Sequence, residues 1–211
     1  ERNSMVSQIK AINEKAKVSI QTMDTVYNEK NIFLRKITIT NNDSKLRNIK
    51  IFLDQQFKIG DTNHADTAYF SSTIESIIHY KGRRVFLVGG MCDSKPFNDY
   101  SIGFCGIEGK EGTWRDAEDG VLSKNSIEHG VVDSIISWNR NIASGDSVTL
   151  YYWVAVAETY KDVCGLLEYI FEKTPEHFIE STKDFWQAWL NQVPVSFSGL
   201  SGKAKDLFYD S

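Results

Sequence analysis

Apolar and polar residues alternate again and again between residues 49 and 157, and a helical spacing replaces this alternation near Tyr160. Alternation with a period of two is typical of strands that bury one face. About eight such runs occur, at the spacing of a sandwich or barrel. The predicted strands cover residues 18–23, 32–39, 49–53, 74–80, 85–88, 100–104, 131–138 and 148–157. The pattern therefore predicts an all-β, mainly antiparallel body, most simply built as two facing sheets.

Short connections and one ambiguous segment complete this body. Residues 81–84 and 143–146 each place a glycine between two predicted strands, which indicates hairpin loops. Residues 1–17 are compatible with either a helix or an edge strand.

Two amphipathic helices are predicted after the strands. The first has one apolar stripe at helical spacing, formed by Val163, Leu166, Leu167, Ile170 and Phe171. The second is expected to begin with Thr174 as its cap and Pro175 at its first position. Its apolar face is wide and aromatic, formed by Phe178, Phe185, Trp186, Trp189 and Leu190. Such a face is expected to pack on the sheet or on a neighbouring domain.

The end of the chain predicts a division into two parts. Residues 193–202 contain one proline, two glycines and three serines, a composition typical of a linker, and residues 206–211 begin a new apolar pattern. We therefore expect a β domain at residues 1–173 and a helical linker at residues 174–211 that leads toward a further domain. The candidates for packing against that domain are Phe185, Trp186 and Trp189.

Composition excludes several classes of function. The 211 residues are 41% hydrophobic, as in globular proteins, and their net charge of −4 comes from interspersed acids and bases. A nucleic-acid surface needs clustered Lys and Arg, so we expect no nucleic-acid partner. No apolar run approaches the ~20 residues that span a bilayer, so we expect no membrane partner.

The cysteines bear on location. Cys92, Cys105 and Cys164 are odd in number and form no Cys-x-x-Cys motif, which favours reduced thiols in a cytoplasmic protein. Secretion stays open, because the chain begins at Glu1 rather than at a methionine.

The densest group of acidic residues lies in the loop at residues 114–120. Its three carboxylates suit a hard cation, but the spacing does not match an EF-hand, and a structural loop with Gly120 at positive φ is favoured. Neighbouring carboxylates on one loop are also poorly placed for the acid and base of glycoside hydrolysis. We predict no metal and no cofactor.

Other candidate residues are few. His79 or His129, with Glu75 or Glu128, are the only general acid and base that the sequence offers, although structural histidines are the favoured interpretation. Trp114 and Trp138 are candidates for stacking on a sugar ring, although tryptophans of a β protein lie more often in the core. No catalytic residue is assigned.

Six segments, taken in order, resemble the N-terminal β domain of the prokaryotic glucoamylase and glucodextranase family of glycoside hydrolases. The similarity covers roughly residues 18–190. The segments are residues 59–61 (IGD), 67–70 (TAYF), 78–87 (IHYKGRRVFL), 114–122 (WRDAEDGVL), 128–134 (EHGVVDS) and 184–190 (DFWQAWL).

The resemblance implies a β-supersandwich related in shape to galactose mutarotases, joined by helices to an (α/α)₆ barrel. In that family the barrel holds the two glutamates of an inverting hydrolysis of α-glucosidic bonds, and no glutamate among residues 1–211 corresponds to them. We therefore expect a non-catalytic accessory domain, with its own C-terminal barrel and an α-glucan or glucoside substrate of the parent enzyme as partners. The alternatives are a carbohydrate-binding module or, less favoured, an autonomous sugar mutarotase or epimerase.

Overall fold

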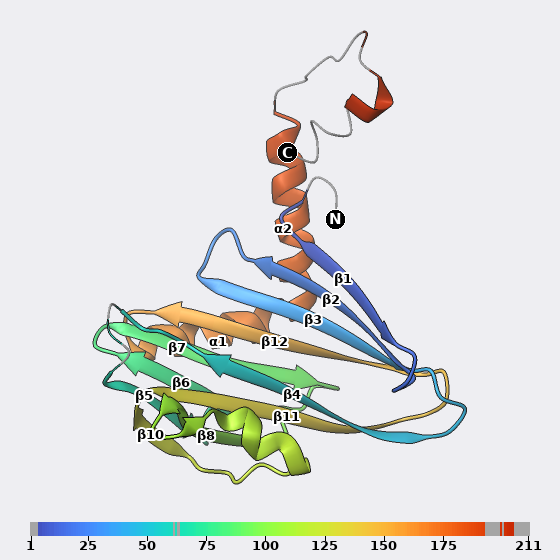
Figure 1. Cartoon of the computed structure of the whole chain (residues 1–211). Coiled ribbons are helices and arrows are strands. Elements are labelled where there is room, and N and C mark those ends of the chain that lie inside the picture. The colour runs from blue at the N-terminus through green and yellow to red at the C-terminus, as the bar shows by residue number, and fades with distance from the viewer. Residues whose placement is uncertain (1–3, 61, 63, 193–198, 200, 205–211) are drawn as a thin grey trace.

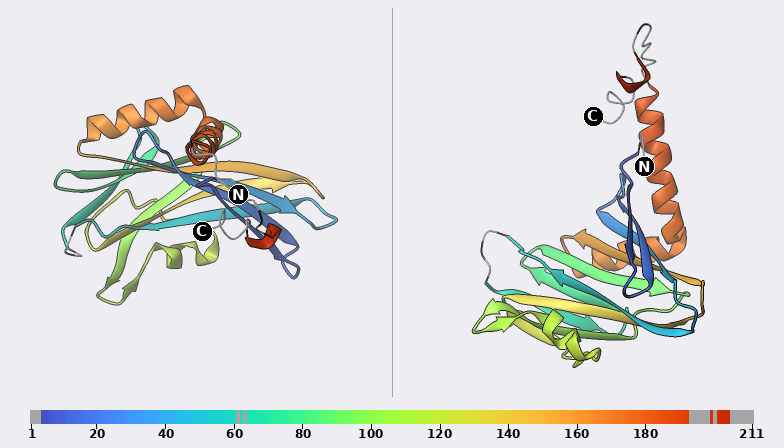
Figure 2. Two further views of the ribbon diagram at one scale, coloured as in Figure 1. Left: turned by 90° about the horizontal axis from the view of Figure 1, so that it is seen from above. Right: turned by 45° about the vertical axis from the view of Figure 1, so that its right-hand side comes forward.

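The computed structural model describes residues 4–60, 62, 64–192, 199 and 201–204. Two antiparallel sheets face each other, and two helices cover the outer side of the larger sheet (Figure 1, Figure 2). The larger sheet has the order β1-β2-β3-β12-β7-β6-β5-β10 and the smaller sheet the order β4-β11-β8-β9. The predicted all-β, two-sheet class is confirmed.

The elements of the larger sheet are β1 (Ser7–Asn13), β2 (Val18–Val26), β3 (Ile32–Asn41), β5 (Asp66–Ser71), β6 (Ser76–Lys81), β7 (Arg84–Cys92), β10 (Ile127–Gly130) and β12 (Ser147–Ala157). Those of the smaller sheet are β4 (Arg47–Gln56), β8 (Asp99–Ile107), β9 (Lys110–Glu111) and β11 (Val132–Ile142). The 3₁₀ helix η1 (Thr113–Asp119) and the helices α1 (Tyr160–Lys173) and α2 (Pro175–Leu190) complete the fold.

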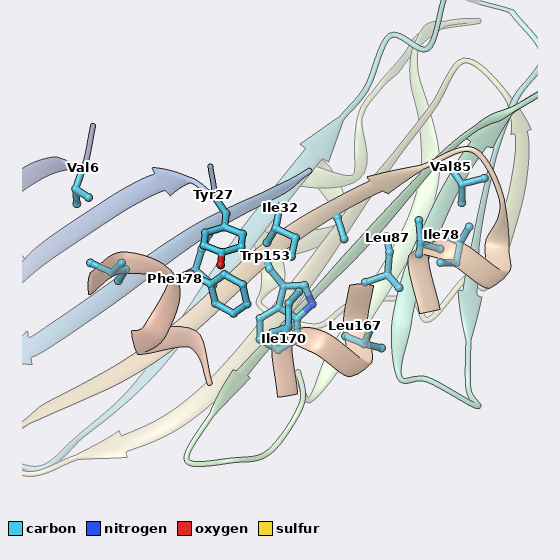
Figure 3. Packing of buried hydrophobic residues seen from close by; sticks show 14 residues of the cluster. Val6, Tyr27, Ile32, Ile78, Val85, Leu87, Trp153, Leu167, Ile170 and Phe178 are labelled. Carbon is cyan, nitrogen blue, oxygen red and sulfur yellow. The ribbon is translucent and has the colours of Figure 1, made fainter. Parts of the chain in front are cut away.

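The central strands of the larger sheet are buried on both faces, so the molecule has two hydrophobic cores. Along β3, Leu34 packs toward the helices and Ile37 toward the smaller sheet. Along β12, Trp153 packs toward the helices and Leu150 toward the smaller sheet. Figure 3 shows the helix-side core, in which Trp153 lies between the sheet and α1. A central strand with two apolar faces explains why β12 is a nearly continuous hydrophobic run.

Strand β7 continues through two consecutive glycines, beyond the predicted end at residue 88. A Cβ on Gly89 would lie 2.6 Å from Nε1 of Trp153, and one on Gly90 would lie 2.8 Å from Cη2 of Trp138. Each glycine therefore leaves room for one indole, Trp153 on the helix side and Trp138 between the sheets. The glycines serve close packing here rather than a turn.

The two helices begin where the sequence predicts, but their caps differ. Thr159 caps α1 by accepting a hydrogen bond from the N–H of Asp162 at 3.2 Å. Thr174 precedes Pro175 at the start of α2, yet its side chain makes no capping bond and its φ is +68°. The expected capping role of Thr174 is therefore wrong, since the left-handed backbone, rather than the hydroxyl, turns the chain between the helices.

The structure answers the prediction for the N-terminal end of the chain but not the one for the C-terminal end. The ambiguous N-terminal segment forms β1, an edge strand whose every residue is exposed. The predicted linker at residues 193–202 lies largely outside the described residues, and residues 206–211 lie wholly outside them. The boundary predicted after residue 173 stays a prediction.

Candidate functional site

One of the two tryptophans proposed to stack on sugar is buried. Trp138 lies on β11 in the core between the sheets, and none of its surface reaches solvent. Its ring packs edge-on against Phe97, with centroids 6.3 Å apart. The expectation that Trp138 binds carbohydrate is therefore wrong, because alternation along β11 turns its side chain inward.

Trp114, the other candidate, is 45% exposed at the start of η1. The guanidinium of Arg115 lies 4.3 Å from the centroid of its ring, and its Nε1 donates to the carbonyl of Glu111 at 3.0 Å. One ring face and the indole donor are thus already in use. Sugar binding at Trp114 stays a prediction.

The loop that contains Trp114 is held in place by hydrogen bonds to its own backbone. The predicted positive φ of Gly120 is confirmed at +81°, and its N–H closes η1 on the carbonyl of Ala117 at 2.9 Å. Asp116 and Asp119 accept backbone hydrogen bonds from Ser123 and Val121. No group of three or more potential metal ligands occurs among the residues that the structure describes.

The histidines and glutamates proposed as an acid–base pair do not come together. His79 is buried between the two sheets, whereas His129 is exposed on the edge strand β10, where its Nδ1 bonds Thr67 at 2.8 Å. Ala68 of β5 pairs with both His79 and Glu128, so a whole strand separates these two residues. Glu75 is exposed in the turn that precedes β6. The hypothesis of an autonomous mutarotase is therefore left without the general acid and base that it proposed.

His79 instead belongs to a buried chain of hydrogen bonds. Its Nε2 lies 2.8 Å from Oγ of Ser134, which donates to Oε1 of Gln55 at 3.0 Å. Since the Ser134 hydroxyl has one proton and gives it to Gln55, His79 must donate through Nε2. Burial lowers the pKa of His79 to about 4. The imidazole is therefore neutral at pH 7 and ties the two sheets together.

A second polar cluster, which the sequence did not indicate, lies on the outer face of the smaller sheet. Thr113 of η1 places its Oγ1 3.0 Å from Oδ2 of Asp54 and 3.0 Å from Oδ2 of Asp133. Its backbone N–H also donates to Asp133 at 2.6 Å. Burial raises the pKa of both carboxyls, and the charge of Asp133 raises the pKa of Asp54 further.

This geometry favours a state in which one of the two carboxyls, Asp54 or Asp133, is protonated. The hydroxyl of Thr113 can donate to only one carboxylate, so its second short contact is favourable when the other carboxyl is protonated. Sequence reasoning missed the cluster because its members lie on β4, η1 and β11, and only the sheet register brings them together.

The predicted packing residues form an exposed surface at the far end of α2. Phe185 is 42% and Trp189 54% exposed, and Trp186 is half-buried between them. The rings pack edge to face, with centroid distances of 5.5 Å for Phe185–Trp186 and 5.6 Å for Trp186–Trp189. We call Phe185, Trp186, Trp189 and the exposed Leu190 the aromatic patch.

The two halves of α2 have different environments. Phe178, Ile179 and Thr182 are buried against the sandwich, with the Phe178 ring 4.9 Å from that of Tyr27. Beyond them, α2 rises past the sheets beside the N-terminal end of β1 (Figure 1, Figure 2). The aromatic patch therefore has no cover within the described part of the chain.

Fold and site together define a class: a two-sheet supersandwich with helices on its outer face, in which the candidate histidines and glutamates do not come together. Solved structures contain the same arrangement. A bacterial glucoamylase complexed with acarbose matches with a TM-score of 0.78 and 12% identity, over 99% of this chain and 29% of that chain. The fold expected from the resemblance is confirmed.

Sequence comparison relates the chain to a glycosyl hydrolase. An uncharacterized glycosyl hydrolase of Methanocaldococcus jannaschii is 24% identical over 187 residues, which cover 87% of this chain and 29% of that protein. No protein-family model matches. The chain thus spans less than a third of the length of either protein. Neither helix in the described residues has the length and apolar character to cross a membrane.

Proposed function

We propose that the chain is a non-catalytic accessory domain of a glucoamylase-like glycoside hydrolase. The observation that supports this most is the match of nearly the whole chain to under a third of a glucoamylase. The separation of the candidate histidines and glutamates supports it further. In this proposal, residues 1–173 are the sandwich, residues 174–211 lead to an (α/α)₆ catalytic domain, and the three free cysteines fit a cytoplasmic location.

The chemistry then belongs to the partner domain. Inverting hydrolysis of an α-glucosidic bond needs one carboxylic acid to protonate the leaving oxygen and one carboxylate to activate water, roughly 6.5–9.5 Å apart. In this account both glutamates lie in the catalytic domain, and the sandwich acts by holding that domain in place.

The aromatic patch is the proposed contact with the catalytic domain. An aromatic side chain buries about 150–250 Å² when it is fully covered, and a standard interface takes about 800 Å² from each partner. Three such rings therefore suit the centre of an interface, where aromatic residues dominate binding energy. Their position on the helix that leads out of the sandwich favours the polypeptide's own catalytic domain as the occupant.

Enzyme assays test the accessory role. Residues 1–211 and the full-length polypeptide that contains them are compared at equal molar concentration on maltose, trehalose and isomalto-oligosaccharides. We expect glucose release by the full-length protein and none by the fragment. Turnover by the fragment alone would refute the accessory role.

A further inference from the structure

A hollow lies on the outer face of the larger sheet, where β5, β6 and β10 meet the N-terminal end of α1 (Figure 1). We call it the tyrosine hollow, because Tyr69, Tyr80 and Tyr160 line it. Its volume is about 570 Å³, within the roughly 300–1,000 Å³ of small-molecule sites. The length of α1 separates it from the start of α2, so the tyrosine hollow is distinct from the aromatic patch.

The register of the strands brings the lining of the hollow together. Tyr69 of β5 lies opposite both Ile78 of β6 and Ile127 of β10. Two residues further along β6, Tyr80 lies opposite Val85 of β7. Residues that lie directly opposite one another share a face of the sheet, so these five side chains from four strands form one surface.

The floor of the hollow is buried, whereas its walls are open to solvent. Ile78 and Val85 belong to the helix-side core and lie at the right of Figure 3. Tyr80 is 38%, Tyr160 41% and Ile127 58% exposed. A ligand can therefore reach the tyrosine rings from solvent, and its binding would remove their apolar surface from water.

The three tyrosine hydroxyls lie near one another. The hydroxyl of Tyr160 is 3.3 Å from Oγ of Ser71, whereas those of Tyr69 and Tyr80 have no hydrogen-bond partner among the described residues. Burial raises the pKa of Tyr69, and the neighbouring Tyr160 and Tyr80 raise it further, so the three groups are close enough to interact. Each hydroxyl can donate or accept a hydrogen bond, so the hollow offers several polar contacts beside its rings.

The charge and ring geometry of the hollow favour a neutral ligand. Of its described lining residues only Glu158 is charged, and Arg83 pairs with that carboxylate. The rings of Tyr69 and Tyr80 pack edge to face with centroids 6.2 Å apart, so a quaternary ammonium group does not fit between them. A ligand with a C–H face and hydroxyl edges matches both the rings and the phenol groups.

We propose that the tyrosine hollow binds one or two rings of a neutral sugar. The C–H face of a sugar ring packs on the exposed rings of Tyr80 and Tyr160, and sugar hydroxyls exchange hydrogen bonds with the hydroxyls of Tyr69 and Tyr80. The hollow itself gives this ligand class, whereas the α-glucans among the probes below rest on the proposed function. The accessory role does not depend on this site, because glucose release tests that role separately.

The tyrosine ring signals of the chain, labelled with ¹³C in all nine tyrosines, provide the test. Maltose, isomaltose, cellobiose and lactose are titrated in turn, with tetramethylammonium as a cationic comparison. We expect saturable shifts of the Tyr69, Tyr80 and Tyr160 signals with at least one sugar, at a dissociation constant of about 1–10 mM, and none with tetramethylammonium. Tyr27 and Tyr152, buried in the two cores, are internal controls whose signals should not move.

Variants separate the site from general solvent effects. Tyr80→Ala and Tyr160→Ala should each weaken sugar binding about five- to tenfold, because each removes a ring from the wall of the hollow. Phe171→Ala is the matched control: Phe171 lies in α1 like Tyr160 and is 55% exposed, but it does not line the hollow, so the affinity should not change.

Three outcomes overturn the proposal. The first is the absence of a saturable shift of the three tyrosine signals with every sugar, which the unmodified chain alone can reveal. The second is a shift that neither Tyr80→Ala nor Tyr160→Ala weakens, which would place the sugar elsewhere on the molecule. The third is saturation by tetramethylammonium in place of the sugars, which would assign the hollow to a cation.

Discussion

Polar side chains between the sheets and on the outer face of the smaller sheet respond to pH in opposite ways. His79, buried between the sheets, is favoured in its neutral form, because burial lowers its pKa to about 4. Asp54 and Asp133, gathered around Thr113, are favoured in their protonated forms, because burial raises their pKa. Titration of each group therefore shifts the free energy of unfolding in its own direction.

His79→Gln should flatten the loss of stability in acid. Between its ordinary pKa of 6.5 and the folded value of about 4, His79 binds a proton in the unfolded state but not in the folded one. Stability should thus fall by on the order of 3 kcal/mol as pH falls through this window. Glutamine keeps a donor for Ser134 and does not titrate. Urea unfolding at about pH 7 and about pH 4.5 checks this, and equal losses for both proteins would contradict it.

Asp54→Asn should have the opposite pH signature. The folded protein holds a proton on the Asp54 pair above the ordinary aspartate pKa of 3.8, so its stability falls as pH rises through the folded pKa. An amide at position 54 can donate to Thr113 permanently. The stability of the variant relative to the parent should therefore increase from acid to neutral pH. The increase should be at most about 1 kcal/mol, because Asp54 reaches solvent, which screens its interactions.

Urea unfolding across the same pH range measures this difference. The control is Asp119→Asn: Asp119 lies at the end of η1 and accepts from the N–H of Val121 at 2.8 Å, outside the pair. A relative stability of Asp54→Asn that falls as pH rises would rule out the shared proton.

At the scale of elements, helix α2 combines an anchor and an exposed surface. Its first half is fixed by Phe178, which is fully buried and packs on Tyr27. Its second half bears the aromatic patch. The aromatic spacing predicted one continuous packing face, and the structure divides that face, because the sheets end about halfway along the helix (Figure 2).

Phe178→Ala should destabilise the chain by about 3–5 kcal/mol, because it leaves a cavity between α2 and the larger sheet. Phe185→Ala, in the same helix, should change stability by no more than about 0.5 kcal/mol, because Phe185 is 42% exposed. Urea unfolding followed by circular dichroism compares the two. Similar costs for both would show that the patch is packed in this chain rather than available to a partner.

Strand β7 shows why some elements could be predicted only in part. The sequence predicted a strand that ends at residue 88, and two glycines, a residue type that weakens strands, follow it. In the fold, Trp153 and Trp138 fill the space over Gly89 and Gly90 from opposite sides. Only tertiary contacts reveal that packing role of the glycines, and the same contacts bury Trp138, in line with the commoner core position of tryptophans in β proteins.

At the scale of the whole molecule, the order of apolar patterns was sufficient for the class of fold. The alternation along residues 49–157 indicated two sheets, and the helical stripes after Tyr160 indicated the outer layer. Sites that assemble across strands were out of reach. The Asp54–Thr113–Asp133 cluster joins residues far apart in sequence, and no local spacing marks it.

The central claim is that the aromatic patch docks this domain on a catalytic partner. Titration calorimetry of residues 1–211 against the separately produced catalytic segment of the full-length polypeptide tests it most directly. We predict saturable binding, weakened at least about tenfold by Trp189→Ser and unchanged by Trp114→Ser, a comparably exposed tryptophan on η1. No binding, or binding that both variants leave unchanged, would contradict the account.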